Sequence, residues 1–467
     1  MTPRRLYHAS LGAAGLLIAI AAFSSFAPGT APAASKPRLF VSVAGSDSGR
    51  CTRAAPCASF ARAYRVAAPG DVVEVAAGVY PGQRIVRDPV KAGRARVTFR
   101  PAHRATVVLG GLGLGTSVHS SDGPRGLAIK RMTIADASGK KRGIAAFNGT
   151  SDVVLEDIRA ANFYLNGIKR FTILGGDWGP CLTTSTGTQS NERVDGCSNS
   201  KIDGTGNEDV VIRNAVFHDY RIIPGSGAHF ECLFVLGVDG LKIQRNRFED
   251  CEFYAIFFQN LGNPTSNVLI EGNWFETPWN GHNVQNRSAA VEFSPRKRPF
   301  TNFVIQRNSF RGAGSLSLNG DADGTVYSGF RVGRNIAMGY AGTCYANVRF
   351  LSNIWIPRGG STCHGTDRLR IFGYVAADGS LRPAANEVRT VRRIFRSIAR
   401  GGSPAAVARA LTRDGVPAPT GGWWNTQTVR DVATDRVYRG AQFGAPGAHP
   451  PLVTVSSWQA AQRALRK

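Results

Sequence analysis

The stretch that decides the fold is a repeated pattern, seen most clearly in VVIRNAVF (210–217), LKIQRNRF (241–248), VLIEGNWF (268–275) and FVIQRNSF (303–310). Further copies read VVLEDIRAANF (153–163), FRVGRNIA (330–337) and VRFLSNIW (348–355). Each copy alternates apolar and polar residues and then turns, as a strand with one buried face does. The repetition predicts a stack of similar units.

An asparagine accompanies the turn in the last six copies, and we align these residues in one column: Asn214, Asn246, Asn273, Asn308, Asn335 and Asn353. Asp157 takes this place in the first copy. A period of roughly 20–35 residues with one alternating strand per repeat predicts a β-solenoid, not a globular sandwich. Asparagine suits left-handed turn backbone, and stacked amides can hydrogen-bond from coil to coil. We therefore interpret the column as architecture.

A second strand is expected before each of these, around 167–171, 233–237, 255–259, 290–294 and 315–319. Its inward side chains would be Ile168, Leu233, Ile256, Val291 and Leu316. Their neighbours would form an exposed strip: Lys169, Phe234, Phe257, Glu292 and Ser317. Phe234 and Phe257 are candidates for stacking against a sugar ring; alternatively, a loop or another domain covers both rings.

The first 34 residues have the order of a secretory signal. Arg4 and Arg5 precede an uncharged apolar run over 11–23, and small residues follow, with Ala31-Pro32-Ala33 as the expected cleavage motif. The alternative is a membrane anchor, but 13 apolar residues fall short of the ~20 that span a bilayer. We expect removal of residues 1–34, no transmembrane segment afterwards, and a secreted or cell-surface protein.

Eight cysteines fall into sequence-local couples, which is typical of disulfides in an exported chain. Nearest-neighbour pairing would give Cys51–Cys57, Cys181–Cys197, Cys232–Cys251 and Cys344–Cys363, one of the 105 connectivities that eight cysteines allow. A zinc site is the alternative, but the chain has no CxxC motif and its histidines are scattered, so we expect no metal there.

Composition excludes several classes of protein. Of 467 residues, 43% are hydrophobic, which excludes wholesale disorder, and the 54 glycines show no three-residue period, which excludes collagen. The charge is lopsided, with 57 Lys and Arg against 32 Asp and Glu, a net +25. Such a balance favours a polyanionic partner, such as nucleic acid, an anionic glycan or anionic lipid headgroups.

The central repeats resemble the right-handed parallel β-helix family, which includes pectate-lyase-like proteins. The segment LFVSVAGSDSGRCTRAAPCASFARAYRVAAPGDVVEVAAGVYPG (39–82) resembles the cap that opens many exported members, with a short helix around 58–67. The resemblance implies a mainly β fold, with a cap and first coil over 35–82 and the β-helix over 83–377. It says little about chemistry, because this fold hosts lyases, hydrolases, epimerases and adhesins.

A compact polar cluster is the candidate catalytic site on the solenoid: His229, Glu231, Asp250 and Glu252, beside Cys232 and Cys251. A histidine among carboxylates could transfer protons, or the cluster could be a surface network beside a crosslink. Asp321 and Asp323 are too few ligands for a confident calcium site. We expect no cofactor; calcium enters only if the protein is a lyase.

After about residue 378 the pattern becomes helical. Val388, Val391, Ile394, Phe395 and Ile398 define one apolar face, and Gly401-Gly402 ends that helix. Ser403-Pro404 starts a second helix, which runs to about Arg413. A third is expected over 425–434 and a fourth from Ser456 or Ser457 onward. Residues 379–467 hold 14 Lys and Arg against 4 Asp and Glu, so this small α-helical domain, 378–467, is strongly basic.

The segment NEVRTVRRIFRSIARGGSPAAVARALTRDGVPAPTGGWWNTQTVRDVATDRVYRG (386–440), continued by HPPLVTVSSWQAAQRAL (449–465), resembles the DNA-binding recombinase domain of large serine recombinases. The resemblance implies a helix-turn-helix-like core, with Thr426, Gln427, Thr428 and Arg430 on the helix that faces the groove. It also implies phosphate contacts from basic residues, for which the candidates are Arg392, Arg393, Arg396, Arg409, Arg413, Arg436 and Arg439. Alternatively, the fold persists and DNA binding has been lost.

Strand exchange is not expected, because that activity needs a separate domain with a serine nucleophile, and residues 38–375 read as β-helix. The leading interpretation is a binding or scaffold protein whose tail holds DNA or another polyanion. The alternative is an extracellular polysaccharide lyase or glycoside hydrolase acting on an acidic glycan along the solenoid. A calcium-dependent rise in unsaturated-uronate absorbance would distinguish the two classes.

Overall fold

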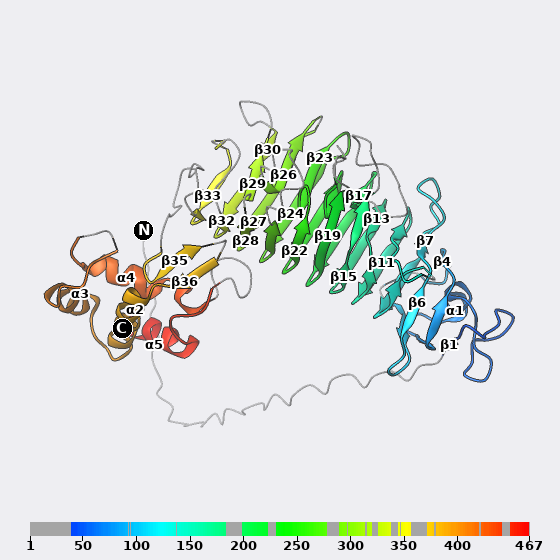
Figure 1. Cartoon of the computed structure of the whole chain (residues 1–467), viewed down its shortest axis with the longest axis horizontal. Helices are drawn as coiled ribbons and strands as arrows, with labels where there is room; N and C mark the ends of the chain where they lie inside the picture. The colour runs from blue at the N-terminus through cyan, green and yellow to red at the C-terminus, as the bar shows by residue number, and fades with distance from the viewer. Residues whose placement is uncertain are drawn as a thin grey trace, which may run out of the picture. The chain divides into compact units, whose positions relative to one another are not determined.

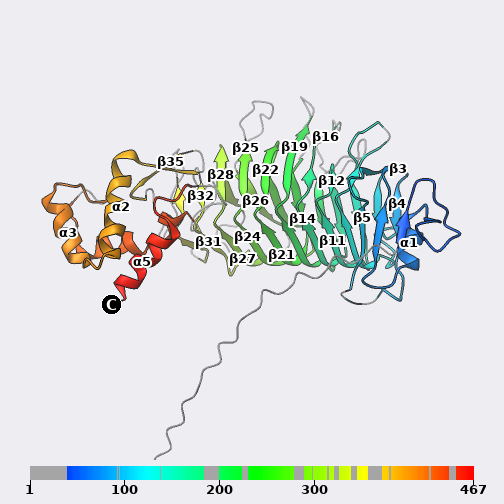
Figure 2. The same ribbon diagram turned by 90° about the horizontal axis from the view of Figure 1, so that it is seen from below.

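A computed structural model describes the chain from residue 39 onward. Within that range the description leaves out residues 92, 94, 137, 184–198, 223–229, 278–288, 297, 313–314, 320–325, 338–343, 346, 356–370, 378–379, 420–421, 441–448 and 467. The predicted signal, residues 1–34, therefore lies outside the described residues. The central region is a stack of coils in which the chain visits three parallel sheets in turn, named here sheets A, B and C (Figures 1 and 2).

Sheet A has thirteen strands and starts with the first strand of the chain. Its strands are β1 (Leu39–Val41), β2 (Val72–Val75), β5 (Val97–Pro101), β8 (Arg125–Lys130), β11 (Ser151–Glu156), β14 (Lys169–Leu174), β18 (Glu208–Arg213), β21 (Val238–Gln244), β24 (Thr265–Glu271), β27 (Phe300–Gln306), β30 (Tyr327–Ser328), β31 (Arg331–Gly333) and β33 (Arg349–Leu351). Lys169 therefore opens a strand of sheet A and does not belong to the predicted exposed strip, whose other members lie in sheet C.

Sheets B and C complete each coil. The twelve strands of sheet B are β3 (Gly78–Tyr80), β6 (Val107–Leu109), β9 (Thr133–Ile134), β12 (Arg159–Ala160), β15 (Asp177–Trp178), β16 (Cys181–Thr183), β19 (Val216–Ile222), β22 (Arg247–Cys251), β25 (Trp274–Thr277), β28 (Ser309–Gly312), β32 (Ile336–Ala337) and β34 (Ile354–Trp355). The nine strands of sheet C are β4 (Gln83–Ile85), β7 (Leu112–Leu114), β10 (Ile144–Ala146), β13 (Phe163–Asn166), β17 (Ser200–Asp203), β20 (Leu233–Val235), β23 (Ile256–Asn260), β26 (Ala289–Pro295) and β29 (Ser315–Leu318).

The interior of the coils is built from equivalent apolar side chains stacked on one another. The inner face of sheet B carries an aromatic ladder of Trp178, Phe217, Phe248, Phe275 and Phe310, all at most 1% exposed. Successive ring centroids are 6.3, 4.9, 5.1 and 4.8 Å apart, with interplanar angles of 20°, 7°, 12° and 9°. Parallel register forces this stacking, because it places the same position of each coil above the last.

The asparagine ladder is confirmed from Asn246 onward. The Asn246 amide nitrogen donates to the Asn273 Oδ1 over 3.0 Å, and the same bond repeats through Asn308 and Asn335 to Asn353 at 3.0, 3.0 and 2.9 Å. The Nδ2 group of each of these five asparagines also donates to a strand carbonyl. The backbone N–H groups of the first four, Asn246, Asn273, Asn308 and Asn335, each donate to the Oδ1 of the next asparagine in the ladder. These buried amides are fully used by the architecture, which is what low exposure demands.

The predicted column is wrong at two positions, Asp157 and Asn214, which are in register with each other but lie one residue before the position of Asn246. Asn214 pairs by register with Arg245, and Ala215 lies in the position of Asn246. Asn214 and Asp157 belong instead to a neighbouring turn column, the first residue after each sheet A strand from β8 to β33 except β30, which pairs beside β27 off the main path. All nine residues of this turn column have φ between 50° and 70°: Arg131, Asp157, Gly175, Asn214, Arg245, Gly272, Arg307, Arg334 and Ser352. Asparagine suits both columns, so aligning the copies by their asparagines placed Asn214 one residue out of register.

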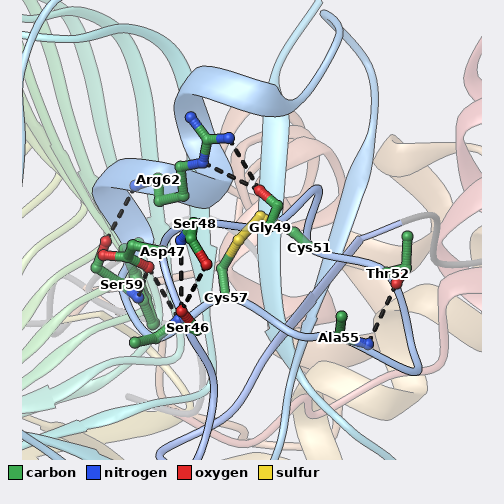
Figure 3. The surroundings of a disulfide bond; sticks show 12 residues. Ser46, Asp47, Ser48, Gly49, Cys51, Thr52, Ala55, Cys57, Ser59 and Arg62 are labelled. Atoms are coloured by element: carbon green, nitrogen blue, oxygen red, sulfur yellow. Dashed lines mark hydrogen bonds between the residues drawn. A yellow bond between two sulfur atoms is a disulfide. The ribbon is translucent and has the colours of Figure 1, made fainter.

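The N-terminal end of the stack is closed by a short helix and a disulfide (Figure 3). Helix α1 (Phe60–Val66) begins at Ser59, whose side chain caps it, and the Phe60 ring stacks on Phe99 at 4.6 Å. The Asp47 carboxylate accepts two backbone N–H bonds at the helix start, each 2.9 Å. Beside it lies the disulfide Cys51–Cys57, a pairing expected from the sequence. The cap covers the first coil as solenoid ends require.

The C-terminal region begins with an antiparallel hairpin, β35 (Tyr374–Ala377) and β36 (Ser380–Pro383), which straddles the predicted domain boundary at 377/378. Four α-helices and a 3₁₀ helix follow: α2 (Ala385–Ala399), α3 (Pro404–Arg413), α4 (Thr426–Thr434), η1 (Arg436–Arg439) and α5 (Val455–Leu465). The predicted apolar face of α2 is buried, and Gly401, at φ 91°, follows its end. The core of this domain also includes Ile336 and Ile354 of the last coils.

Candidate functional site

A basic hollow lies in the helical domain. It is a cavity of about 710 Å³ where three arginines from three helical segments meet: Arg400 after α2, Arg430 on α4 and Arg463 on α5. Its floor is the start of α3, with Gly401, Gly402, Ser403 and Pro404. The Ser403 hydroxyl caps α3 by accepting the Ala406 N–H at 3.2 Å. Arginine charge and a helix N-terminus together favour an anion here.

A second hollow of about 340 Å³ adjoins the first through Arg463, which lines both. Its lining adds Arg436, Trp458 and Arg466. The Arg439 guanidinium lies 4.8 Å from the Trp458 ring centre, so its charge is used partly in a cation–π contact. Arg400, Arg430, Arg436, Arg463 and Arg466 form what we call the basic face. Arg400, Arg463 and Arg466 were not among the candidates predicted from the sequence.

The predicted recognition helix is α4, and its polar residues differ in what they do. Thr428 is part of the N-cap, because its N–H and hydroxyl both bond to Asn425 Oδ1, at 2.8 and 3.0 Å. Gln427 donates to Asp431 one turn later, at 2.7 Å. Thr426 is exposed and Arg430 lines the cavity. The connection from α3 to α4 spans 414–425, longer than the usual three- or four-residue turn of a helix-turn-helix.

Several predicted phosphate contacts are engaged within the protein. Arg392 donates to the Leu452 carbonyl at 3.0 Å, which ties α2 to the segment before α5. Arg393 and Arg413 both pair with Asp414, whose pKa is lowered first by the hydrogen bond from Arg393. Arg396 and Arg409 are exposed on α2 and α3. The structure thus separates arginines that hold the fold from those that face solvent.

The predicted catalytic cluster is not assembled on an open surface. The disulfide Cys232–Cys251 is present, as expected. However, Glu231 and Glu252 are 0% and 2% exposed and are bonded to Asn199 and to the Ile222 N–H, at 2.7 and 2.6 Å. Asp250 pairs with Arg221. His229 lies outside the described residues. Both glutamates are therefore buried and hydrogen-bonded to structural partners.

The predicted sugar platform is also wrong in its exposure. Phe234 and Phe257 stack on each other, with ring centres 5.1 Å apart, but they are only 4% and 6% exposed. They form a separate apolar cluster with Leu236, Phe253 and Tyr254. Glu292 and Ser317, from the same predicted strip, are 2% and 1% exposed. Both rings lie outside the main core, as predicted, but Phe253 and Tyr254, between β22 and β23, pack with them.

Sequence reasoning missed a charged network on the outer face of sheet B. His218 Nε2 lies 2.6 Å from Asp177 Oδ1, and Nδ1 lies 2.7 Å from Asp219 Oδ2. An imidazolium ring can donate to both carboxylates at once, whereas a neutral ring can donate to one. Lys141 pairs with Asp177 at 2.9 Å, and Arg221 with Asp219 at 2.8 Å. Lysine, aspartate, histidine, aspartate and arginine side chains therefore follow one another along the network.

The two aspartates of this network stay ionised. Partial burial pushes the pKa of Asp177 upward, but hydrogen bonds from Lys141 and His218 outweigh burial and hold it below its ordinary value. Burial acts in the same direction on the pKa of Asp219, where His218 and Arg221 again outweigh it. Asp177 also lines a hollow of about 530 Å³ between sheets A and B, together with Arg131, Asp157 and Arg159.

The other predicted cysteine pairs and the predicted calcium ligands lie partly or wholly outside the described residues. Cys181 and Cys344 are disulfide-bonded, and their expected partners, Cys197 and Cys363, lie outside the described residues. Within the described ranges, no group of three or more His, Cys, Asp or Glu side chains is arranged to hold a metal ion. Asp321 and Asp323 lie outside those ranges. None of the helices described in the structure is long and apolar enough to cross a membrane.

Comparison with known proteins adds one family and two distant folds. The family model described as Recombinase matches residues 385–467. No curated protein matches the chain. A solved structure titled "The complex structure of XylC with xylose" is 11% identical, with a TM-score of 0.36, over 65% of this chain and 69% of that chain. An alginate lyase from Paenibacillus sp. str. FPU-7 is 12% identical, with a TM-score of 0.22, over 67% of this chain and 97% of that chain. The chain therefore joins a parallel β-helix, evident from its own strand pairing, to a C-terminal domain of the Recombinase family.

Proposed function

We propose that the protein is an exported DNA-binding protein, in which the C-terminal domain contacts DNA through the basic face and the β-helix serves as a scaffold. One observation carries the proposal: Arg400, Arg430 and Arg463 converge on one cavity at the start of α3. Guanidinium groups grip phosphate oxygens through paired N–H bonds, and helix N-termini favour the same anions. The match of residues 385–467 to the Recombinase family supports the choice of DNA among polyanions.

The charge of the domain supports contact with a dense polyanion. Residues 379–467 carry 14 Lys and Arg against 4 Asp and Glu. Duplex DNA carries one phosphate charge per about 1.7 Å of axis, so a face with several solvent-facing arginines gains from releasing condensed counterions. Thr426, at the exposed first turn of α4, lies one turn before Arg430 on the same helix. In this arrangement α4 would meet base edges while the basic face holds phosphates.

Strand exchange is not part of this proposal, because the described residues before the helical domain form the β-helix. Export is supported by the signal-like order of residues 1–34 and by the disulfides Cys51–Cys57 and Cys232–Cys251. Extracellular DNA, such as that in a surface matrix, would then be the material bound.

The test is fluorescence anisotropy of a labelled 20-base-pair duplex with the chain from residue 35 onward. Three phosphate contacts predict a log–log salt slope near −3, because each contact releases about 0.9 of a counterion. The double variant Arg430→Gln/Arg463→Gln should flatten the slope by about 2. The matched control is Arg393→Gln/Arg413→Gln, which removes the same charge from arginines paired with Asp414. Equal losses in both variants would reduce the proposal to non-specific charge attraction.

A further inference from the structure

The turn column carries arginine where the backbone disfavours it. Arg131, Arg245, Arg307 and Arg334 have φ of 54–58°, in the left-handed region. This region is disfavoured for side chains other than glycine, and only Asn and Asp are commonly tolerated there. Nevertheless, arginine occupies four of the nine turns from β8 to β33. Residues held in sparsely populated backbone regions often belong to functional sites, which makes the arginines of these turns candidates for one.

Most of these arginines are not consumed by ion pairs. Arg307 pairs with Glu271 at 2.9 Å. Arg131, Arg245 and Arg334 are exposed, and none has an ion-pair partner among the residues that the structure describes. Successive coils lie about 4.8 Å apart, so the turn column offers guanidinium groups along the edge between sheets A and B at multiples of that spacing.

A hollow opens beside this edge at its N-terminal end. Arg131 and Arg159, from neighbouring coils, line its volume of about 530 Å³, together with Asp157 and Asp177. Pockets of about 300–1,000 Å³ accommodate small organic ligands such as one or two sugar rings. Arg159 is exposed and, like Arg131, lacks an ion-pair partner in the described part of the chain. The hollow therefore presents two available cations and two carboxylates.

Asp177 is held in place from outside the hollow. Lys141 and His218 each bond to one of its oxygens, at 2.9 and 2.6 Å, and His218 is itself fixed by Asp219. Each carboxylate oxygen has further lone pairs that can accept a hydrogen bond. An acceptor fixed in this way, beside two guanidinium groups, matches a ligand that carries hydroxyl donors and an anionic group together.

We propose that this edge, from the Arg131–Arg159 hollow along the turn column, binds an acidic polysaccharide. The carboxylate groups of the sugar chain would lie on the turn-column arginines, and sugar hydroxyls would donate to Asp157 and Asp177. A duplex nucleic acid fits less well, because its phosphates are much denser than the arginines of this edge. None of the described residues lining the hollow is aromatic, so bases have no platform to stack on. The site is separate from the basic face.

The test is isothermal titration calorimetry of the chain from residue 35 onward with a hexameric oligouronate, and with a neutral hexaose of the same length. The oligouronate should bind and the neutral sugar should bind at least tenfold more weakly. The double variant Arg131→Asn/Arg159→Gln should weaken oligouronate binding about tenfold, because each exposed ionic contact contributes about a threefold change. Asn at position 131 suits the left-handed backbone, so the variant should fold.

The matched control is Arg50→Gln/Arg84→Gln, which removes two exposed charges from the cap and from sheet C; its affinity should change less than twofold. Arg430→Gln/Arg463→Gln should leave oligouronate binding intact while it weakens DNA binding, and Arg131→Asn/Arg159→Gln should do the reverse. Equal loss in Arg50→Gln/Arg84→Gln, or equal binding of the neutral sugar, would overturn the proposal. Loss of DNA binding in Arg131→Asn/Arg159→Gln would identify the edge as a nucleic-acid surface and overturn it as well.

Discussion

The β-helix and the helical domain use polar residues in opposite ways. In the β-helix the most regular polar residues are buried: Asn273 is 0% exposed and makes hydrogen bonds to both neighbouring coils. In the helical domain most buried positions are apolar, such as Val391 and Ile394 on α2, and the arginines of the basic face are exposed. Repeated contacts between coils therefore stabilise the β-helix, and its candidate binding residues are those that differ from coil to coil, such as the arginines of the turn column. The helical domain shows no such repeat, and its candidate binding site is the cavity on which Arg400, Arg430 and Arg463 converge.

The largest effect is expected in the aromatic ladder. Phe248→Ala removes a ring stacked between Phe217 and Phe275, at 4.9 and 5.1 Å. We expect a loss of about 4 kcal/mol in the free energy of unfolding, from lost burial and the cavity left behind. Denaturant unfolding followed by far-ultraviolet circular dichroism measures it. A loss below about 1 kcal/mol would mean that neighbouring coils collapse into the space, and that stacking is not a principal source of stability.

The two asparagine positions should behave differently. Asn273→Ala leaves the Asn246 N–H, which donates to Asn273 Oδ1 at 2.9 Å, without an acceptor in a buried position. We expect a loss of about 3 kcal/mol. Asn214→Gly, at an exposed residue with φ 57°, should change stability by less than about 0.5 kcal/mol, because glycine accepts that backbone. Similar losses in thermal unfolding would contradict the separation of the two columns.

A smaller, pH-dependent effect is expected at Asp152. Its two oxygens bond to Arg170 at 2.7 and 2.8 Å, and this hydrogen-bonded pair holds the pKa of Asp152 below its ordinary value despite partial burial. A lowered folded-state pKa gives stability that is present above about pH 4, near the unfolded value, and is lost as the pH falls through the folded-state pKa. Asp152→Asn should cost about 1 kcal/mol at pH 7.

The same variant provides its own control across pH. Melting temperatures of Asp152→Asn and the parent chain should converge as the pH falls below about 4, because the parent carboxylate becomes protonated in that direction. Asparagine keeps the shape and tolerates the φ of 57° at this position. A difference that stays constant over this range would assign the effect to packing and not to the charge of Asp152.

The smallest effect is expected at Arg393 in the helical domain. Its pair with Asp414 is exposed, at 41% and 35% of the two side chains, and exposed ion pairs contribute little. Arg393→Gln should change the free energy of unfolding by less than about 0.5 kcal/mol and DNA affinity less than Arg430→Gln does. A large loss of DNA affinity would place phosphate on α2 and would redraw the basic face.

The architecture was predictable because its signals are local. Alternation and turn residues within each copy indicated the coils, and the cap of α3 at Ser403 was readable from two adjacent letters. The register of Asn214 was not, because the same amino acid satisfies two adjacent positions of the turn. The covering of Phe234 and Phe257 was not predictable either, since it depends on Phe253 and Tyr254 in a connection of irregular length.

The sites were harder to predict because they depend on distant residues. Asp177 and His218 are 41 residues apart, and which residues become lateral neighbours depends on the length of the intervening coil. Coil length varies in this chain, so periodicity alone cannot pair them. Arg400 and Arg463 come from helices whose packing was unknown, although both were visible as basic residues near helix ends. A search for arginine at turn positions would have found Arg131, Arg245 and Arg334.

Arginine in the turn column has a consequence for anyone who would engineer the protein. Replacing Arg131, Arg245, Arg307 and Arg334 by glycine or asparagine should relieve about 1 kcal/mol of backbone strain at each turn. A thermostabilised variant is therefore easy to design at this edge. The same four changes would remove four positive charges from one edge of the molecule and, under the proposal made above, would weaken ligand binding there, a trade-off between stability and function known from other proteins. Selection for heat tolerance alone would be expected to replace these four arginines early.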